Sequence, residues 1–383
     1  MKKIANYMLF GAVIFLAACS QNESSNTPSQ SSPAERQTPD PKRWISQFCV
    51  DKCGYFDPDS MQYVIAPQFI EAHNFSVNGL ARVVNRDGHG FINAQGQMVI
   101  PAQLEEASDF SANGLARVKV NGKYGYINVR QMVIPAQFDW ADDFSANGLA
   151  LVEQNGKWGY INAQGKMVIP AQFGGAWPFS ANGLAPVEQN GKWGYINAQG
   201  KMVIPAQFGG AWPFSANGLA RVSQNGKYGY IDAQGKIAIP VQFELASDFS
   251  ANSLTPAKQD GKWGYINAQG KMVIPAQYDQ ANDFSANGLA AIEQNGEWGY
   301  INAQGQMVIP AQYDQANDFS ANGLARVLRY GYLVYINAQG EVVVYVDKVC
   351  DTRVVKNADG QIVWPKKSTA DICADAVPRS GSK

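Results

Sequence analysis

Apolar and polar residues alternate in short runs that return at a fixed spacing along most of the chain. In one central stretch, residues 148–154 alternate as a β-strand, Asn155-Gly156 is a two-residue hairpin signal, and residues 157–162 alternate again as a returning strand. Residues 163–165 fit a three-residue hairpin loop with a left-handed glycine, and residues 166–169 predict a third strand. Pro170 ends that strand because proline has no N–H to donate. The pattern predicts a three-stranded meander followed by a connection with room for one short extra strand.

The same unit recurs nine times. The aromatic residue that ends the second strand returns at intervals of 34 to 36 residues, at Tyr55, Phe91, Tyr126, Tyr160, Tyr195, Tyr230, Tyr265, Tyr300 and Tyr335. Residues 355–365 align with half of a further copy. Repetition at such a period is the signature of a repeat architecture. It leaves no room for a separate catalytic domain.

The Asn-Gly turn fixes which residues share a face of the predicted sheet. It places Glu153 opposite Trp158, Val152 opposite Gly159, Leu151 opposite Tyr160 and Ala150 opposite Ile161. One face then carries Ala150, Val152, Gly159, Ile161, Met167 and Ile169, and the other carries Leu149, Leu151, Trp158, Tyr160 and Val168. Because both faces are apolar, we expect neighbouring copies to stack face to face. At Gly159 we expect a large side chain of the next copy to pack against bare backbone.

The fold class predicted from this pattern is all-β, a tandem array of about nine meanders of 35 residues. Nine copies exceed the four to eight blades usual in β-propellers, and three strands are fewer than the usual four. We therefore expect an open, superhelical solenoid stack, with a closed propeller-like ring as the alternative, in which Tyr55 and Tyr335 would meet. The terminal copies diverge, with Cys53 and His89 at the Trp position and no Asn-Gly-Lys turn within residues 326–335. Such divergence is expected of caps whose outer face meets solvent.

The recurring stretches G-L-A-x-V, N-G-K-W-G-Y-I-N, G-K-M-V-I-P-A-Q-F/Y-D and D-F-S-A-N resemble the WG-repeat family of bacterial proteins. The resemblance covers nearly all of residues 43–366. It implies tandem β units, often on secreted or envelope proteins, with partner binding rather than a common enzymatic activity. We expect the repeated aromatic side chains to form the core between copies: Trp158, Tyr160, Trp193, Tyr195, Trp263, Tyr265, Trp298 and Tyr300.

The N-terminus has the pattern of an export signal. Lys2 and Lys3 precede an apolar run over residues 7–18 that is too short to span a bilayer. The run ends Leu16-Ala17-Ala18-Cys19, which resembles a bacterial lipobox, so residues 1–18 are predicted to be a lipoprotein signal peptide and Cys19 the lipidated first residue. By resemblance to Gram-negative lipoproteins, Ser20 implies sorting to the outer membrane. Residues 19–42 are predicted to be a flexible tether, residues 43–366 the array and residues 367–383 a C-terminal tail.

Composition and motifs argue against an enzyme and against a nucleic-acid binder. The formal net charge is −1, which gives none of the basic excess of nucleic-acid-binding proteins. Only His73 and His89 could act as acid–base groups near neutral pH, and no nucleophile-elbow, phosphate-loop, dinucleotide or zinc-protease motif is present. We therefore expect no catalytic residue, no cofactor and no metal site.

An aspartate precedes the recurring Phe in five copies, at Asp109, Asp143, Asp248, Asp283 and Asp318. A row of calcium sites is one interpretation, but one carboxylate per copy is far below a calcium ligand set. The preferred interpretation is a side chain that hydrogen-bonds its own turn.

Beyond Cys19, two cysteines lie near each end of the array and none lies in its interior copies. Export permits disulfides, and we predict Cys49–Cys53 and Cys350–Cys373, although four cysteines allow three connectivities. A zinc site has enough thiols but would require the two ends to meet, which an open array forbids.

The central copies differ systematically at one place. Trp177-Pro178 and Trp212-Pro213 stand, behind a Gly-Gly pair, where other copies have a D-x-A-x-D pattern. They form either an aromatic ridge that contacts a partner, since aromatic residues are enriched at binding hot spots, or a filling for the gap left by the glycines. The sequence thus predicts a non-enzymatic, lipid-anchored envelope protein that meets the membrane through its lipid and uses the array as a protein-interaction or structural module. The alternative is a glycan- or cell-wall-binding repeat protein.

Overall fold

The structure is a computed structural model that describes residues 45–49, 52–250, 254–350 and 352–376, all within one compact unit. The predicted signal peptide, the tether and Cys19 lie outside the described residues. The predicted C-terminal tail contains a helix, α1 (Thr369–Ala376). Among the described residues, no helix is long and apolar enough to cross a membrane.

The described residues form nine antiparallel sheets that follow one another along the chain. The first has three strands, β1 (Ile45–Cys49), β2 (Cys53–Asp57) and β3 (Gln62–Phe69). Seven four-stranded sheets follow: β4 (Glu71–Phe75), β5 (Ala81–Asn85), β6 (Gly88–Ile92), β7 (Met98–Leu104); β8 (Glu106–Ala107), β9 (Ala116–Val120), β10 (Lys123–Ile127), β11 (Met132–Phe138); β12 (Trp140–Phe144), β13 (Ala150–Gln154), β14 (Lys157–Ile161), β15 (Met167–Phe173); β16 (Gly175–Ala176), β17 (Leu184–Gln189), β18 (Lys192–Asn197), β19 (Met202–Phe208); β20 (Gly210–Phe214), β21 (Ala220–Gln224), β22 (Lys227–Ile231), β23 (Ile237–Phe243); β24 (Leu245–Ala246), β25 (Leu254–Gln259), β26 (Lys262–Asn267), β27 (Met272–Tyr278); β28 (Gln280–Ala281), β29 (Ala290–Gln294), β30 (Glu297–Ile301), β31 (Met307–Tyr313).

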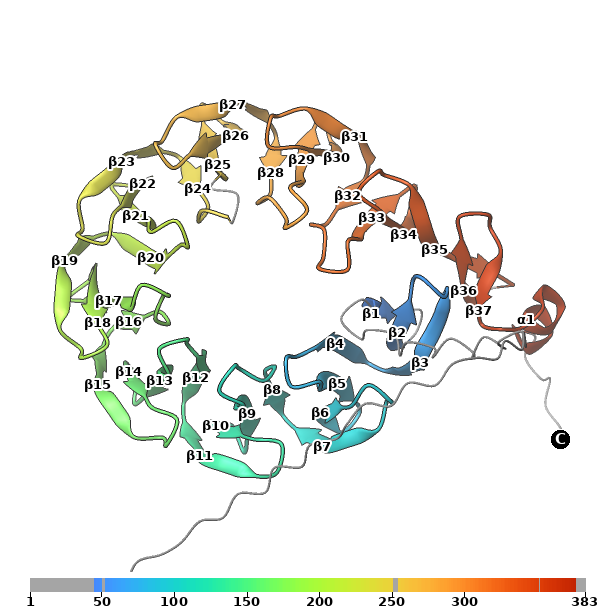
Figure 1. The fold of residues 1–383 in the computed structure, drawn as a ribbon, viewed down its shortest axis with the longest axis horizontal. Coiled ribbons are helices and arrows are strands. Elements are labelled where there is room, and N and C mark those ends of the chain that lie inside the picture. The colour runs from blue at the N-terminus through green and yellow to red at the C-terminus, as the bar shows by residue number, and fades with distance from the viewer. Residues whose placement is uncertain (1–44, 50–51, 251–253, 351, 377–383) are drawn as a thin grey trace, which may run out of the picture. The chain divides into compact units, whose positions relative to one another are not determined.

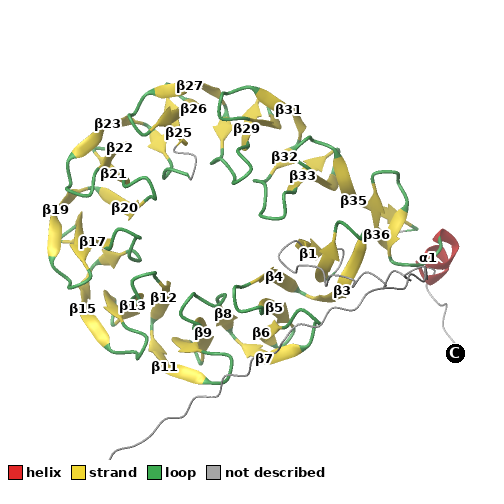
Figure 2. Ribbon diagram, in the orientation of Figure 1, coloured by secondary structure: helices red, strands yellow, loops and turns green. Residues whose placement is uncertain are grey.

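The last sheet has six strands, β32 (Gln315–Ala316), β33 (Ala325–Arg329), β34 (Tyr332–Ile336), β35 (Val342–Val349), β36 (Thr352–Asn357) and β37 (Ile362–Trp364). Its outer hairpin, β36–β37, is the predicted half-copy. The short extra strand foreseen in the connection is the first strand of each four-stranded sheet, so a complete copy has four strands rather than three. Figure 2 shows that strands make up nearly all of the regular structure, with α1 beside the last sheet.

The register predicted for the central copy is confirmed. Leu151 pairs with Tyr160, Val152 with Gly159, and Glu153 with Trp158. The turn uses left-handed conformations at Asn155 (φ 54°) and Gly156 (φ 71°), which asparagine and glycine adopt more readily than other residues.

The next hairpin departs from the prediction through two β-bulges. Trp158 pairs with Phe173 and Tyr160 with Ile169, so the register shifts between these pairs and shifts again before Ile161. A bulge sets two residues against one and reverses which side chains share a face. Ile169 therefore lies on the face of Tyr160, and its predicted place beside Ile161 was wrong. Val168, predicted to pack on the Tyr160 face, is exposed.

Gly159 is required by its own sheet rather than by the next copy. A Cβ atom there would lie 2.6 Å from the carbonyl oxygen of Ile169 and 2.6 Å from the amide nitrogen of Ala171. Both atoms belong to the bulged strand β15 of the same sheet. The expected insertion of a side chain from the next copy was therefore wrong.

Neighbouring sheets do stack face to face, as predicted. Ala150, Val152 and Ile161 pack against Tyr126, Ile134 and Phe138 of the preceding sheet. On the opposite face, Leu151, Tyr160 and Ile169 pack against Ala185, Val187 and Ile196 of the following one. Burial of two apolar faces per sheet supplies the main stabilisation of the array.

The predicted open solenoid was wrong, because the sheets form a closed β-propeller (Figure 1). The first strand of each complete blade lies nearest the centre and the fourth lies at the circumference (Figure 1). Eight blades have all four strands, and the three-stranded sheet β1–β3 stands between the last blade and the first complete one. No described sheet combines strands from both ends, so the ring closes by side-chain packing.

The closing contact joins the two terminal sheets. Phe56 packs in one cluster with Tyr335 and Val344, and the ring centroids of Tyr63 and Trp364 are 5.4 Å apart. The divergent terminal copies are thus fitted to each other rather than to solvent, which corrects the expectation of solvent-facing caps.

Candidate functional site

Each complete blade presents one variable side chain in its innermost strand or directly after it, on a repeated backbone frame. We call the residue two before the recurring Phe the rim position, and it is occupied in chain order by His73, Ser108, Asp142, Trp177, Trp212, Ser247, Asn282 and Asn317. In seven of these eight blades its backbone carbonyl accepts a hydrogen bond from the buried Tyr hydroxyl of the preceding copy, for example from Tyr160 to Trp177 at 2.8 Å and from Tyr195 to Trp212 at 2.9 Å. The exception is Ser108, because Phe91 stands at the Tyr position before it. The frame uses only backbone atoms of the rim position, so the side chain there can change without disturbing it.

The tyrosines of this frame belong to the core, as predicted. Tyr160, Tyr195, Tyr265 and Tyr300 are 0% exposed, and burial raises the pKa of each hydroxyl. Each lies against the recurring Phe of the next blade, with ring centroids 4.7–5.0 Å apart. The predicted core tryptophans, Trp158, Trp193, Trp263 and Trp298, are only partly buried and pack at the edge of these clusters.

Trp177 and Trp212 differ in how they are held. The guanidinium carbon of Arg221 lies 4.1 Å from the ring centroid of Trp212, and that ring also covers Gly210. Trp177 is 41% exposed, and Pro186 stands in its blade where Arg221 stands in the other. Trp212 therefore does fill a glycine gap, whereas the gap at Gly175 is filled by Trp193. Among the aromatic contacts of described residues none joins Trp177 to Trp212, so they are two separate aromatic positions.

A second feature of the rim is a set of ion pairs between blades. Nε atoms of Arg82, Arg117 and Arg221 lie 3.4, 4.0 and 3.2 Å from carboxylate oxygens of Asp109, Asp143 and Asp248 of the next blade. The predicted bond from these aspartates to their own turns is wrong, since the asparagine of the fully described FSAN turns fills that role, as Asn147 does for the amide of Leu149.

The composition of neighbouring copies follows this pairing. Where Pro178 and Pro213 replace the aspartate, the preceding copies carry Leu151 and Pro186 in place of arginine. Asp283 and Asp318 keep the carboxylate although Pro256 and Ala291 replace the arginine. Burial, with the nearby charges of Asp318 and Asp248, raises the pKa of Asp283 to about 6. No cluster of three or more His, Cys, Asp or Glu side chains able to hold a metal ion occurs among the described residues.

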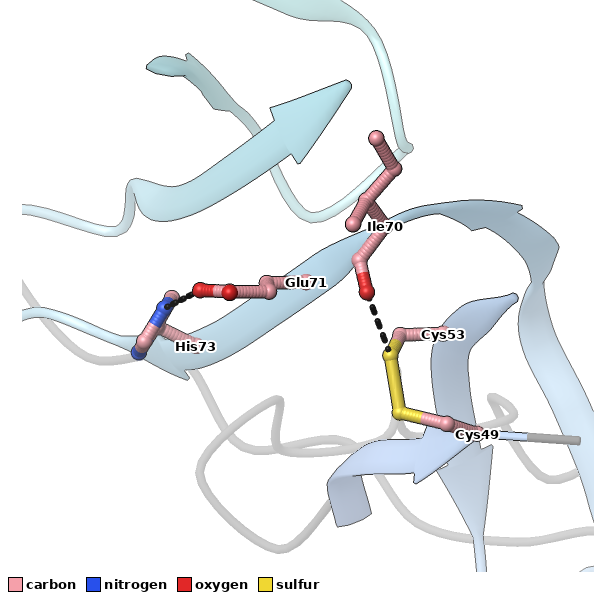
Figure 3. The surroundings of a disulfide bond; sticks show 5 residues. All are labelled: Cys49, Cys53, Ile70, Glu71 and His73. Atoms are coloured by element: carbon pink, nitrogen blue, oxygen red, sulfur yellow. Dashed lines mark hydrogen bonds and ion pairs between the residues drawn. A yellow bond between two sulfur atoms is a disulfide. The ribbon is translucent and has the colours of Figure 1, made fainter. Parts of the chain in front are cut away.

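The two histidines lie together near the start of the ring. Arg82 donates from Nη2 to Nδ1 of His73 at 3.1 Å and from Nη1 to Nδ1 of His89 at 3.4 Å. Burial and the positive charge of Arg82 lower the pKa of both imidazoles. Figure 3 shows the other side of the His73 ring, where Nε2 lies 3.6 Å from a carboxylate oxygen of Glu71.

Both predicted disulfides are present in the structure. Cys49 and Cys53 join β1 to β2, and the Sγ atom of Cys53 lies 3.2 Å from the carbonyl oxygen of Ile70 (Figure 3). Cys350 and Cys373 join the turn after β35 to α1. The two ends of the array do meet, so the expectation that an open array would keep the four cysteines apart was wrong. The sulfurs are paired in disulfides, however, and carry no thiolate with which to bind zinc.

Neither the rim position nor the arginine partners of the aspartates were predicted from the sequence. A partial signal was available, because arginine and aspartate are both present or both absent at five of the seven seams between complete blades, while Asp283 and Asp318 remain without an arginine. It could not be recognised without knowing that each copy contacts the next through these positions.

Comparison with known proteins identifies the repeat. The family model described as WG containing repeat matches eight segments, residues 54–88, 90–124, 124–158, 158–193, 193–228, 228–263, 263–298 and 298–332. None of the curated proteins matches the chain in sequence.

Solved structures match the chain at low sequence identity, and one of them, with a TM-score above 0.5, shares the fold. A crystal structure of a eukaryotic initiation factor is 11% identical with a TM-score of 0.57, over 77% of this chain and 93% of that one. Hsv2p of Kluyveromyces lactis is 9% identical with a TM-score of 0.39, over 66% and 97%. Sqt1 of Saccharomyces cerevisiae is 11% identical with a TM-score of 0.39, over 70% and 92%.

Proposed function

Because this chain belongs to the family of WG-containing repeat proteins, we propose that its propeller is a non-enzymatic protein-interaction module. We further propose that the module is tethered to the bacterial envelope, at the outer membrane, by a lipid on Cys19. The observation that carries the interaction role is the rim position, where five residue types occupy eight equivalent places, seven of them on the same Tyr–carbonyl frame. Variation confined to accessible side chains on a rigid scaffold is typical of recognition surfaces.

Trp177 is the rim residue best suited to anchor a partner. It is large and 41% exposed, and no guanidinium covers its ring as Arg221 covers that of Trp212. Aromatic side chains of this kind dominate the binding energy of protein interfaces. The non-enzymatic role is supported by the two histidines, which are both engaged by Arg82 and biased toward the neutral form.

The interaction role is tested by affinity capture from envelope extracts with the lipid-anchored protein. Trp177→Ala should reduce the captured partner by about tenfold or more, because loss of a hot-spot aromatic costs about 2 kcal/mol or more. The matched control is Val168→Ala, another exposed apolar side chain, which lies on the outer strand β15 and should leave capture unchanged. Equal capture by both variants would remove Trp177 from the proposal. If the protein binds purified peptidoglycan and the Trp177→Ala variant does not, the partner is a glycan and not a protein.

The lipid anchor has its own test. Labelled palmitate should be incorporated into the wild-type chain and into a Cys350→Ser variant, but not into Cys19→Ser. Wild-type protein should sediment with outer membranes, while the Cys19→Ser variant should not. Labelling that persists without Cys19 would overturn the anchor and leave the interaction role intact.

A further inference from the structure

A pocket on the last blade stands where that copy departs from the repeat. It has a volume of about 260 Å³ and is lined by Arg329, Tyr330, Tyr332, Val334, Tyr345 and Asp347. We call it the last-blade pocket. The same positions of the central blade β12–β15 are occupied by Gln154, Asn155, Lys157, Gly159, Pro170 and Gln172. None of the other seven complete blades has any of the six pocket residues at the corresponding position, so the whole lining is specific to this copy.

The pocket lies on the side of the last blade that faces the preceding blade. Val334 and Tyr345 belong to the hydrophobic cluster of Tyr313, in blade β28–β31. Leu333, on the opposite face of β34, belongs to the cluster that closes the ring. Both blades beside the pocket lie within residues 254–350, which the structure describes without a gap. The pocket is therefore separate from the closing contact.

Two of its tyrosines extend into solvent. Tyr330 is 79% exposed and Tyr332 is 50% exposed. Tyr330 also has a left-handed backbone conformation, with φ of 50°, where most other blades have asparagine. Such strain in a bulky residue is found mainly at functional sites, where a contact outweighs its cost. The two rings are thus placed for contact with another molecule rather than for packing within the blade.

The charge of the pocket that is open to a partner is a guanidinium. The side chain of Arg329 has no hydrogen bond or ion pair with a described residue, and its guanidinium carbon lies 5.4 Å from the ring centroid of Tyr330. The carboxylate of Asp347, in contrast, accepts hydrogen bonds from Nζ of Lys356 at 2.6 Å and from the amide of Lys348 at 2.7 Å. A carboxylate is the group that best complements the planar donors of an arginine.

The composition of the lining favours a protein as the partner. Relative to the central blade, an asparagine and a lysine have become tyrosines and a glutamine has become an arginine. Tyrosine and arginine are enriched at protein interfaces and at their hot spots, whereas lysine is depleted there. The pocket is also smaller than the roughly 300–1,000 Å³ of sites that enclose a whole drug-sized ligand. Its size suits a single side chain.

We propose that the last-blade pocket binds an acidic segment of a partner protein. An Asp or Glu side chain of that segment enters the pocket and accepts hydrogen bonds from the guanidinium of Arg329. The rings of Tyr330 and Tyr332 pack against the neighbouring residues of the segment. This proposal rests on the interaction role proposed above, and it names a second contact surface on a different blade from Trp177.

Photo-crosslinking of the full-length protein in the cells that produce it tests the proposal. Photoreactive benzoylphenylalanine in place of Tyr332 should cross-link to a protein, and mass spectrometry should map the product to a segment that contains Asp or Glu. The matched control places the same group at Lys157, the corresponding position of blade β12–β15, and should not give this product.

Two further substitutions test the roles of the individual side chains. Arg329→Gln should lower the cross-linking yield by about tenfold, the size expected for loss of a hydrogen bond between charged groups. Arg130→Gln removes an exposed arginine on the loop before β11 and should leave the yield unchanged. Tyr330→Asn should lower the yield severalfold without lowering the melting temperature, because asparagine relieves the backbone strain. A loss of contact in a fully folded variant cannot be explained by unfolding.

The opposite outcomes are equally clear. The proposal is wrong if residue 332 gives no product, if residue 157 gives the same product, or if Arg329→Gln leaves the yield unchanged. A product that a peptidoglycan hydrolase removes would also overturn it, because the pocket would then bind a glycan. If capture that depends on Trp177 persists while residue 332 gives no product, this inference fails and the interaction role stands.

Discussion

A glycine between the Trp and Tyr positions stands in eight of the nine copies, and Val334 takes its place in the last. In the eight copies, the outer strand bulges over the glycine; seven of them carry a proline at the bulge, whereas the first carries Ala66 there and Pro67 next. In the last copy Tyr345 replaces that proline, and Val334 pairs directly with Tyr345 without a bulge. The loss of the glycine and the loss of the bulge are coupled because a Cβ atom cannot share the space of a bulged backbone.

Substitution of the central glycine tests this coupling. Gly159→Ala should lower the free energy of unfolding by about 2 kcal/mol, because the new Cβ atom meets backbone atoms of Ile169 and Ala171 that cannot move independently. The matched control is Gly209→Ala, where the nearest atom to a new Cβ is 3.4 Å away and φ is not positive. The melting temperature should fall for the first variant and stay level or rise slightly for the second. Equal melting temperatures would show that the strand relaxes around the added atom.

Among the elements, the turn between the second and third strands of each blade is the most strongly specified by sequence. Its first residue has φ between 52° and 56° at Asn121, Asn155, Asn190, Asn225, Asp260 and Asn295. The last copy lost the Asn-Gly-Lys motif and was expected to lack this turn. It nevertheless keeps the geometry, with φ of 50° at Tyr330 and 77° at Gly331. Sheet pairing imposes the turn there on a residue that disfavours it.

Restoring the preferred residue should stabilise this hairpin. Tyr330→Asn is expected to raise the free energy of unfolding by about 1 kcal/mol, because a tyrosine in the left-handed region carries strain and its ring, 79% exposed, is compensated only by a solvent-exposed contact with the Arg329 guanidinium at 5.4 Å. Tyr332→Asn is the control: it changes the same side chain two residues later, within β34, where φ is not positive, and should bring no gain. Denaturant midpoints of the two variants measure the difference. If both variants are more stable than the wild type, the cause is the more polar surface and not the relief of strain at residue 330.

The same elements show how far the sequence alone could be used. Hairpin register follows from contacts a few residues apart, so the pairing of Leu151 with Tyr160 and the inter-blade faces were predictable. The position of Ile169 depended on two β-bulges, and the alternation of apolar and polar residues along a strand does not show where bulges occur. At the candidate site, Trp177 was identifiable because it breaks the repeat, whereas the Arg82–Asp109 pair joins different copies and required the arrangement of neighbours.

At the scale of the ring, closure was beyond the reach of periodicity. Whether copies form an open stack or a ring depends on a small rotation between neighbours, repeated eight times, and no local pattern encodes that angle. The terminal divergence was visible but ambiguous, since solvent-facing caps and mutually fitted ends both require changed residues. The packing of Phe56 on Tyr335 and of Tyr63 on Trp364 decides for the ring.

Closure makes the number of copies a structural constraint. In an open array the deletion of one whole copy would cost one interface, whereas in a ring it also separates the closing faces, or strains every remaining seam. Deletion of residues 263–297 should therefore lower the melting temperature by several degrees and increase amide exchange in β2 and β34, far from the deletion. The reason is the exposure of Phe56, Tyr335 and Val344, each worth about 1.5–3 kcal/mol when buried. The control exchanges residues 263–297 for a second copy of residues 193–227, which alters a similar length of chain while keeping nine sheets, and should preserve both readouts. Unchanged exchange in β2 and β34 after the deletion would mean that the two ends are not held together in solution.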